Sequence, residues 1–291
     1  MNRTLYIHSW FLIPGTIILL IGVLPGISSS QVIAEEIRPV LTEKITRHQY
    51  SDLQTGKNTP YLLYHPDPKS KAKPASLLIY LHGAGGSLKS YNYSREPYQK
   101  LRAALSQSGF YVVVPELGKL HFMNAVAKQA LDGVTAQVLT EQKISANRVH
   151  IMGTSMGGGS SLAYAIHRPD LIRSVCAVMP MTDFADWIKE NPKYAKPVAA
   201  AYGGTPLQTP GNYERNSAIR NVDAFQNIPV MLIHGLKDRT VLPQHSQQLA
   251  EQLQKKQYPC QLITLDDLTH TDEIMRNIQL KAANFFEEAT K

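Results

Sequence analysis

Short apolar runs and longer amphipathic stretches alternate along most of this sequence. Residues 76–81 form an almost wholly apolar run, which is typical of a buried strand in a parallel sheet. Comparable runs predict strands at about 61–64, 76–81, 110–114, 149–152, 174–179, 230–233 and 261–265. Patterns with helical spacing predict helices at about 98–108, 123–141, 155–167, 244–256 and 272–288. This alternation predicts an α/β fold in which helices cover both faces of a mostly parallel central sheet.

Two regions interrupt this rhythm. Residues 180–228 contain no clear strand and are rich in proline, glycine, asparagine and aromatic residues. Long loops inside a compact domain are usually functional, so we interpret this segment as a small cap-like insertion between two late strands. Residues 35–59 are polar and give no clear prediction. We expect a single domain over residues 35–291 that carries the insertion.

The first 34 residues have a different character. An apolar run at 10–24 follows Arg3, and small residues precede Ala34. This order is typical of an export signal that is cleaved after a small residue, so we expect a periplasmic or secreted protein. The run is also long enough for an uncleaved membrane anchor. A buried structural helix is a third interpretation, although Pro14 and Pro25 would interrupt it.

The composition favours a folded protein without a nucleic-acid partner. Hydrophobic residues make up 43% of the 291 residues and charged residues 18%, which is enough apolar material for a packed core. The net charge of +7 is spread along the chain, and the basic cluster at 69–73 is typical of a solvated loop. Cys176 and Cys260 lie in apolar, strand-like runs, which favours two free buried thiols over a disulfide. No metal-binding motif is present, and we expect neither metal nor cofactor.

The pentapeptide Gly153-Thr154-Ser155-Met156-Gly157 carries the clearest chemical signal. It fits G-x-S-x-G, a sharp turn between a strand and a helix that exposes a serine hydroxyl above a parallel sheet. The apolar run before it and the helical pattern after it provide that context. A strained backbone at the serine presses the residues two positions away against each other, which favours glycine there. Ser155 is therefore the candidate nucleophile.

A serine hydroxyl needs an imidazole to take its proton and a carboxylate to orient that imidazole. On a parallel sheet these groups are expected after the carboxyl ends of later strands. Asp238 follows one such strand and His270 follows the last one, so the chain order is Ser155, Asp238, His270. Asp183 is a rival for the role of the acid. Other acidic residues near the histidine are expected to be solvated or to cap helices: Asp266, Asp267 and Asp272.

The oxyanion of a tetrahedral intermediate requires backbone N–H donors. One is expected from Met156, which follows the nucleophile. The second is expected from the glycine-rich loop after the strand at 76–81, with the Ala84 amide favoured and the Gly85 amide as the alternative. His82 and His234 each precede a glycine at a strand end, where we expect them to pack and to form local hydrogen bonds.

Aromatic residues gather in two parts of the sequence that could line a substrate pocket. One group follows the oxyanion loop and contains Tyr91, Tyr93 and Tyr98. The other lies in the insertion and contains Phe184, Trp187, Tyr194 and Tyr202. The chosen pocket candidates are Tyr91, Phe184 and Trp187. Ordinary packing beneath a long loop is an equally good interpretation of these residues.

From about Tyr61 to the C-terminus the chain resembles the α/β-hydrolases. It is most similar to dienelactone-hydrolase-like esterases and to the catalytic domain of the prolyl oligopeptidase family. The second likeness rests on the stretches at 202–206 and 216–217, and on 228–235 with the following Asp238 and Val241. Dienelactone hydrolases use a cysteine where this chain has Ser155. Prolyl oligopeptidases carry an N-terminal β-propeller, for which the stretch before the first predicted strand leaves no room.

This resemblance implies acyl transfer in which Ser155 attacks a carbonyl, His270 moves the proton and Asp238 orients His270. We expect a carboxylesterase that acts on small-molecule esters. The alternative is a serine peptidase of the prolyl oligopeptidase type that acts on short peptides. A third hypothesis is a non-catalytic binding protein with a hydrolase fold, against which the complete set of catalytic residues argues.

Overall fold

The computed structural model describes residues 44–70, 74–91 and 96–291. The expected export signal or anchor at 1–34 lies outside these residues. No helix in the described part of the chain combines the length and the apolar character needed to cross a membrane.

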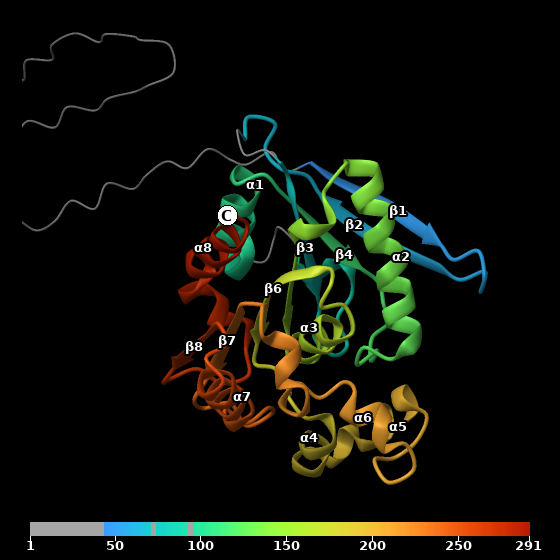
Figure 1. The fold of residues 1–291 in the computed structure, drawn as a ribbon, viewed down its shortest axis with the longest axis vertical. Coiled ribbons are helices and arrows are strands. Elements are labelled where there is room, and N and C mark those ends of the chain that lie inside the picture. The colour runs from blue at the N-terminus through green and yellow to red at the C-terminus, as the bar shows by residue number, and fades with distance from the viewer. Residues whose placement is uncertain (1–43, 71–73, 92–95) are drawn as a thin grey trace, which may run out of the picture. The chain divides into compact units, whose positions relative to one another are not determined.

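The centre of the structure is an eight-stranded sheet with the order β1-β2-β4-β3-β5-β6-β7-β8 (Figure 1). Strands β1, β2 and β4 pair antiparallel, and the pairs from β4 through β3 to β8 are parallel. The strands are β1 (Ile45–Ser51), β2 (Asn58–Tyr64), β3 (Ser76–Leu81), β4 (Phe110–Pro115), β5 (Val149–Thr154), β6 (Ile172–Val178), β7 (Val230–Gly235) and β8 (Cys260–Leu265). The predicted mostly parallel sheet is confirmed.

Strand β1 is the strand that the hydrophobic pattern did not predict. It pairs with β2 from Ile45 opposite Tyr64 to Ser51 opposite Asn58, at the edge of the sheet. Its side chains are half-buried or exposed, so the apolar signal of a core strand is missing. Backbone pairing to β2, which the sequence pattern does not record, holds this strand in place.

Helices cover both faces of the sheet, as predicted. Residues of α2 (Ala125–Gln142), α3 (Met156–His167) and α7 (Gln244–Lys255) share one hydrophobic cluster with the sheet. Residues of α1 (Gln99–Gln107) and α8 (Gln279–Ala289) belong to the cluster on the other face (Figure 1). The side chains of β3 alternate between the two clusters, with Ile79 in the first and Tyr80 in the second. This alternation follows from the two-residue period of a strand.

The predicted helix at 272–288 is divided in the structure. Residues Asp272–Asn277 form a 3₁₀ helix, η7, and α8 begins only at Gln279. Between them the backbone of Ile278 has φ −126° and ψ 0°, which is outside the helical region. Directly after this break, the side chain of Gln279 accepts hydrogen bonds from backbone amides near the start of α1, at Lys100 and Leu101.

The insertion between β6 and β7 consists of short helices around an aromatic core. Its α-helices are α4 (Phe184–Glu190), α5 (Ala195–Tyr202) and α6 (Pro210–Glu214). Phe184, Trp187, Tyr202 and Tyr213 form a separate cluster with Phe122 and Met156, which belong to the main body of the fold. The insertion therefore packs directly against the start of α3, where the candidate nucleophile lies.

Cys176 and Cys260 are both free thiols, as expected. Cys176 is fully buried in β6, but Cys260 is only partly buried in the edge strand β8. Burial raises the pKa of the Cys260 thiol to about 11.

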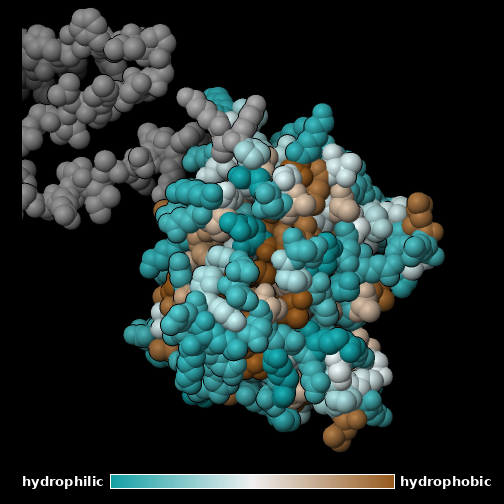
Figure 2. All heavy atoms as spheres, viewed as in Figure 1, coloured by the Kyte–Doolittle hydropathy of each residue, from teal (hydrophilic) through white to brown (hydrophobic). Residues whose placement is uncertain are grey.

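Hydrophilic residues predominate on the face shown in Figure 2, and hydrophobic residues form small separate groups there. The exposed large hydrophobic residues of the described chain come from different elements: Leu53, Leu120, Val126, Leu207, Leu236 and Leu280. Scattered apolar residues of this kind are normal on a protein surface and do not define a docking site.

The turn between β5 and α3 depends on extremely close backbone contacts. Ser155 has φ 56° and ψ −119°, a strained conformation for a residue with a side chain. A Cβ atom at Gly153 would lie 2.2 Å from the carbonyl oxygen of Gly157, and one at Gly157 would lie 2.0 Å from the carbonyl oxygen of Leu81. Both glycines are therefore required by the geometry of the turn.

Gly157→Ala is expected to lower the free energy of unfolding by about 3 kcal/mol, because the new methyl group would displace the backbone at Leu81. Urea unfolding followed by circular dichroism measures this change. Gly211→Ala is the matched control, since its Cβ would meet only the flexible side chain of Arg215 at 3.1 Å. Equal stability of the two variants would contradict the steric requirement at Gly157.

Candidate active site

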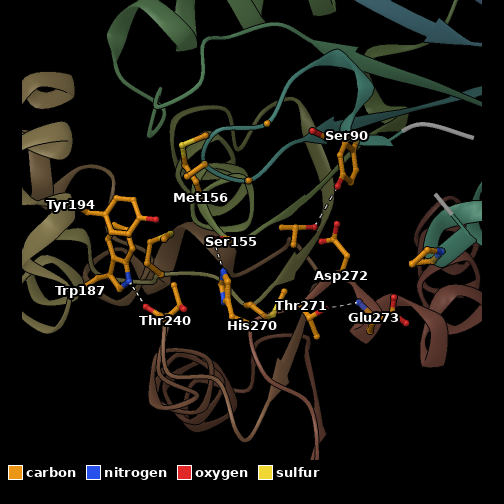
Figure 3. A pocket seen from close by; sticks show the side chains of 18 of the residues that line it. Ser90, Ser155, Met156, Trp187, Tyr194, Thr240, His270, Thr271, Asp272 and Glu273 are labelled. Carbon is orange, nitrogen blue, oxygen red and sulfur yellow. Dashed lines mark hydrogen bonds between the residues drawn. The ribbon is translucent and has the colours of Figure 1, made fainter. Parts of the chain in front are cut away.

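The structure brings Ser155, His270 and Asp238 into one hydrogen-bonded series (Figure 3). The distance from Ser155 Oγ to His270 Nε2 is 2.9 Å, and that from His270 Nδ1 to Asp238 Oδ2 is 2.6 Å. Ser155 lies at the turn after β5, Asp238 follows β7, and His270 follows β8. The three residues meet because parallel strands present their carboxyl ends at the same edge of the sheet.

Asp238 is a buried carboxylate with several donors around it. Its Oδ1 accepts hydrogen bonds from the amides of Thr240 at 2.8 Å and Val241 at 3.0 Å. Its Oδ2 faces His270 and, at 3.4 Å, Nε2 of His234. Burial alone would raise the pKa of Asp238, but hydrogen bonds from His234, from His270 and from the Val241 amide outweigh burial and hold the pKa well below its usual range. Asp238 is therefore ionised at neutral pH.

The ionised carboxylate determines the tautomer of His270. A carboxylate only accepts hydrogen bonds, so Nδ1 of His270 carries a proton and donates a hydrogen bond to Asp238. Nε2 is then free to accept a hydrogen bond from the Ser155 hydroxyl. This arrangement prepares His270 to act as a general base toward Ser155.

The structure separates the two candidates for the second oxyanion donor. The amide of Gly85 donates to the carbonyl oxygen of Lys119 at 2.9 Å, so the alternative that named Gly85 is wrong. The Ala84 amide donates to no backbone carbonyl within residues 44–70, 74–91 and 96–291, and Ala84 lines the cleft. Met156 begins α3 and also lines the cleft, and its amide belongs to the first turn of the helix, where backbone donors lack helical partners. Met156 and Ala84 remain the predicted donors.

Ser155 and His270 lie in a cleft with a volume of about 740 Å³. On one side of them, Trp187 and Tyr194 form an aromatic wall (Figure 3), with ring centroids 4.8 Å apart and ring planes at 29°. The indole N–H of Trp187 donates to the carbonyl oxygen of Thr240 at 3.0 Å, which ties the insertion to the loop that carries Asp238. The other side of the cleft is polar and carries Ser90, Asp272 and Glu273 (Figure 3). Tyr80, Thr154 and Arg276 also line the cleft.

Two of the three aromatic residues predicted to line the pocket lie behind its wall. Phe184 is fully buried and packs against Phe122 and Tyr202. Tyr91 is also fully buried, where it contacts the rings of Tyr64, Tyr80 and Tyr98. Aromatic side chains near a site often fill the core beneath it, and composition alone does not separate the two positions. Trp187 does line the cleft.

The rival acid Asp183 has a structural role. Its carboxylate caps the start of α4 by accepting from the amides of Ala185 and Asp186, and its other oxygen accepts from Arg220 at 2.6 Å. His82 and His234 form local hydrogen bonds, as expected: His82 with the Gly83 carbonyl, and His234 with Ser246 and with the Val241 carbonyl.

The sequence analysis missed the position of Asp272, and it left open whether the aromatic residues Tyr98 and Tyr194 line the pocket or fill the core. Tyr194 lies on the aromatic wall, and Asp272, which was expected to be solvated or to cap a helix, lines the polar side. Tyr98 lies behind the polar side and contacts Asp272. Only the fold brings these residues together. The described residues contain no group of three or more side chains suited to hold a metal ion.

The sequence profile of the prolyl oligopeptidase family matches residues 118–291, which is more than half of the chain. The chain therefore belongs to this family, and the matched segment contains Ser155, Asp238 and His270. It is a serine hydrolase with the α/β-hydrolase fold.

The matches to curated relatives cover only part of each relative. The uncharacterized peptidase YtmA of Bacillus subtilis (strain 168) is 30% identical over 141 residues, which cover 48% of this chain and 54% of the relative. A probable dipeptidyl-aminopeptidase B of Sclerotinia sclerotiorum is 28% identical over 231 residues, which cover 74% of this chain and 23% of the relative. The matches thus span about half of the first relative and about a quarter of the second.

Solved structures share the fold at low sequence identity. A puromycin-hydrolyzing peptidase of Mycobacterium tuberculosis aligns with a TM-score of 0.71 and 19% identity, over 87% of this chain and 40% of that protein. An S-formylglutathione hydrolase of Agrobacterium tumefaciens aligns with a TM-score of 0.69 and 16% identity, over 87% of this chain and 98% of that protein. At these identities the two structures establish the common fold alone.

Asp238→Asn is expected to lower kcat by about 10⁴-fold, because an asparagine no longer fixes the tautomer of His270. Asp183→Asn is the control, since it removes a carboxylate that caps α4 and pairs with Arg220. We expect this control to lose stability and to keep its kcat. Steady-state kinetics and thermal unfolding of both variants measure the two effects, and the reverse result would assign the acid to Asp183.

The lowered pKa of Asp238 also predicts how stability depends on pH. Because the pKa in the folded state lies below the ordinary value of 3.8, ionised Asp238 stabilises the fold above that value, and this contribution disappears as the pH falls toward the folded pKa. The difference in unfolding free energy between wild type and Asp238→Asn should be constant above about pH 5 and shrink below about pH 4. Urea titrations across this range test it, and a difference that does not change with pH would contradict it.

Proposed function

We propose that this protein is a serine peptidase that cleaves short peptides through an acyl-enzyme on Ser155. The observation that carries the proposal is the hydrogen-bonded series from Ser155 through His270 to buried Asp238. The family match supports the peptidase reaction over the ester hydrolysis expected from sequence, and the sequence relatives are described as peptidases.

In this mechanism Ser155 Oγ attacks the peptide carbonyl while Nε2 of His270 takes the hydroxyl proton. The negative charge on the carbonyl oxygen is stabilised by the amides of Met156 and Ala84. The C–N bond then breaks as His270 gives the proton to the leaving amine. Water attacks the resulting ester, His270 takes a proton from the water, and the acid product leaves as the proton returns to Ser155.

The aromatic wall supports an apolar residue on the acyl side of the cleaved bond. The Tyr194 ring is partly exposed in the cleft and stacks on Trp187, which is almost fully buried. The sulfur-containing side chains of Met156 and Met181 also line the cleft. Such a surface favours an uncharged side chain or ring, with proline as the best fit because its ring packs flat on aromatic faces. A charged side chain would lose hydration there. The ammonium group of Lys193 already lies 5.3 Å from the centroid of the Tyr194 ring, which disfavours a second cation at this ring.

Ester hydrolysis is the second candidate function. The same groups cleave esters, and an alcohol leaves more readily than an amine. Two solved esterases share the fold over nearly their whole length. The shared region covers 98% of an S-formylglutathione hydrolase and 100% of a ferulic acid esterase, which supports ester hydrolysis as the second candidate.

The deciding experiment compares kcat/KM for peptidyl p-nitroanilides with that for p-nitrophenyl butyrate, using the full chain. Anilides with proline, alanine and arginine before the cleaved bond test the aromatic wall, and Ser155→Ala is the control for each substrate. We expect Ser155-dependent anilide cleavage that is fastest for proline and slowest for arginine. Ester turnover with no anilide turnover would replace the peptidase proposal with the esterase.

A further inference from the structure

The hydroxyl of Tyr98 lies within hydrogen-bond distance of three residues that are far from it in the sequence. Tyr98 is fully buried and lies behind the polar side of the cleft. Its hydroxyl oxygen lies 3.1 Å from the Tyr80 hydroxyl, 3.2 Å from Thr154 Oγ1 and 3.3 Å from Asp272 Oδ1. Tyr80, Thr154 and Asp272 all line the cleft, so one hidden hydroxyl joins three parts of its wall.

The direction of these hydrogen bonds follows from the groups involved. A carboxylate only accepts hydrogen bonds, so the Tyr98 hydroxyl donates its hydrogen bond to Asp272. The Tyr98 oxygen then accepts from Tyr80, and it is also within hydrogen-bond distance of the Thr154 hydroxyl. Burial, together with the nearby Tyr80 and Asp272, raises the pKa of Tyr98 well above its usual value, so the phenol keeps its proton. The Tyr98 hydroxyl therefore donates its hydrogen bond toward Asp272.

The network connects the two reacting residues. Thr154 directly precedes Ser155, and Asp272 follows His270 by two positions. His270 lies in a loop between β8 and η7, where regular backbone pairing does not hold it. Asp238 restrains the imidazole from one side, and the contact from Tyr98 to Asp272 restrains the end of the same loop. Gln279 reinforces this connection, because it binds the start of α1, directly after Tyr98.

We propose that Tyr98 is a positioning residue that holds the His270 loop at the distance from Ser155 that catalysis requires. The inference rests on the acyl-transfer mechanism proposed above. Tyr98 does not line the cleft, so it acts through Thr154 and Asp272. Displacing a reacting group by about 1 Å can reduce a rate by about 100-fold, so loss of this restraint should affect kcat strongly. Substrate binding should change little, since the lining side chains stay in place.

Tyr98→Phe removes the hydroxyl and keeps the ring. We expect kcat and the rate of labelling by a fluorophosphonate probe to fall by about 10- to 100-fold, with KM within about twofold of wild type. Tyr164→Phe is the matched control, because Tyr164 is also a buried tyrosine whose hydroxyl donates to a carboxylate, that of Asp132, at 2.9 Å. It lies about 13 Å along α3 from Ser155. We expect similar losses in melting temperature for both variants, and a loss of rate for Tyr98→Phe alone.

Asp272 provides a second route that does not depend on how well Tyr98→Phe folds. Asp272→Ala removes the acceptor of the Tyr98 proton, whereas Asp272→Asn keeps an oxygen that can accept it. We expect a large fall in labelling rate for the alanine variant and substantial recovery for the asparagine variant. The double variant Tyr98→Phe with Asp272→Ala should be no slower than the slower single variant, because both changes break the same contact.

The outcomes separate this inference from the proposed function. A folded wild type that the probe does not label would overturn the acyl-transfer mechanism and this inference with it. A labelled wild type that reacts no faster than Tyr98→Phe and Asp272→Ala would overturn the positioning role and leave the proposed function standing. Equal losses of rate in Tyr98→Phe and Tyr164→Phe would also overturn it, because the effect would then come from stability.

Discussion

The close backbone approach around Ser155 is the constraint on which the rest of the site depends. The α-carbon of Gly157 lies so near the Leu81 carbonyl that no side chain fits between them. This contact joins the start of α3 to the end of β3, and it therefore brings the serine hydroxyl beside the loop that contains Ala84. The same turn directs Thr154 toward Tyr98. One steric requirement thus positions the nucleophile, the proposed oxyanion donors and part of the cleft wall.

Hydrogen bonding to carboxylates distinguishes the functional acid from the structural one. Asp238 and Asp183 are both buried and both follow strands of the parallel region. Asp238 is oriented by the amides of Thr240 and Val241 and faces His270, whereas Asp183 is engaged by the start of α4 and by Arg220. A buried carboxylate needs such partners to stay ionised. Their identity determines whether its charge orients a histidine or stabilises a helix.

The cleft has two chemically different sides. The aromatic wall comes from the insertion, and the polar side comes from Ser90 and the residues after His270. Ser155 and His270 lie between them (Figure 3). The hydrogen bond from Trp187 to Thr240 means that the insertion and the Asp238 loop hold each other in place. The aromatic wall and the loop that orients His270 therefore share structural support.

The sequence by itself determined the parallel sheet, the Ser155 turn, and Asp238 and His270 as candidates, because buried strands are continuously apolar and a strained serine turn requires glycine. It did not determine β1, whose stability comes from backbone pairing to β2. It also could not separate Trp187, on the cleft wall, from Phe184 and Tyr91 behind it, because these residues have the same chemical character. The roles of Gly85 and Asp272 depended on partners distant in the sequence, Lys119 and Tyr98. Only the tertiary structure decided such contacts, since local patterns record periodicity and sterics but not which distant groups meet.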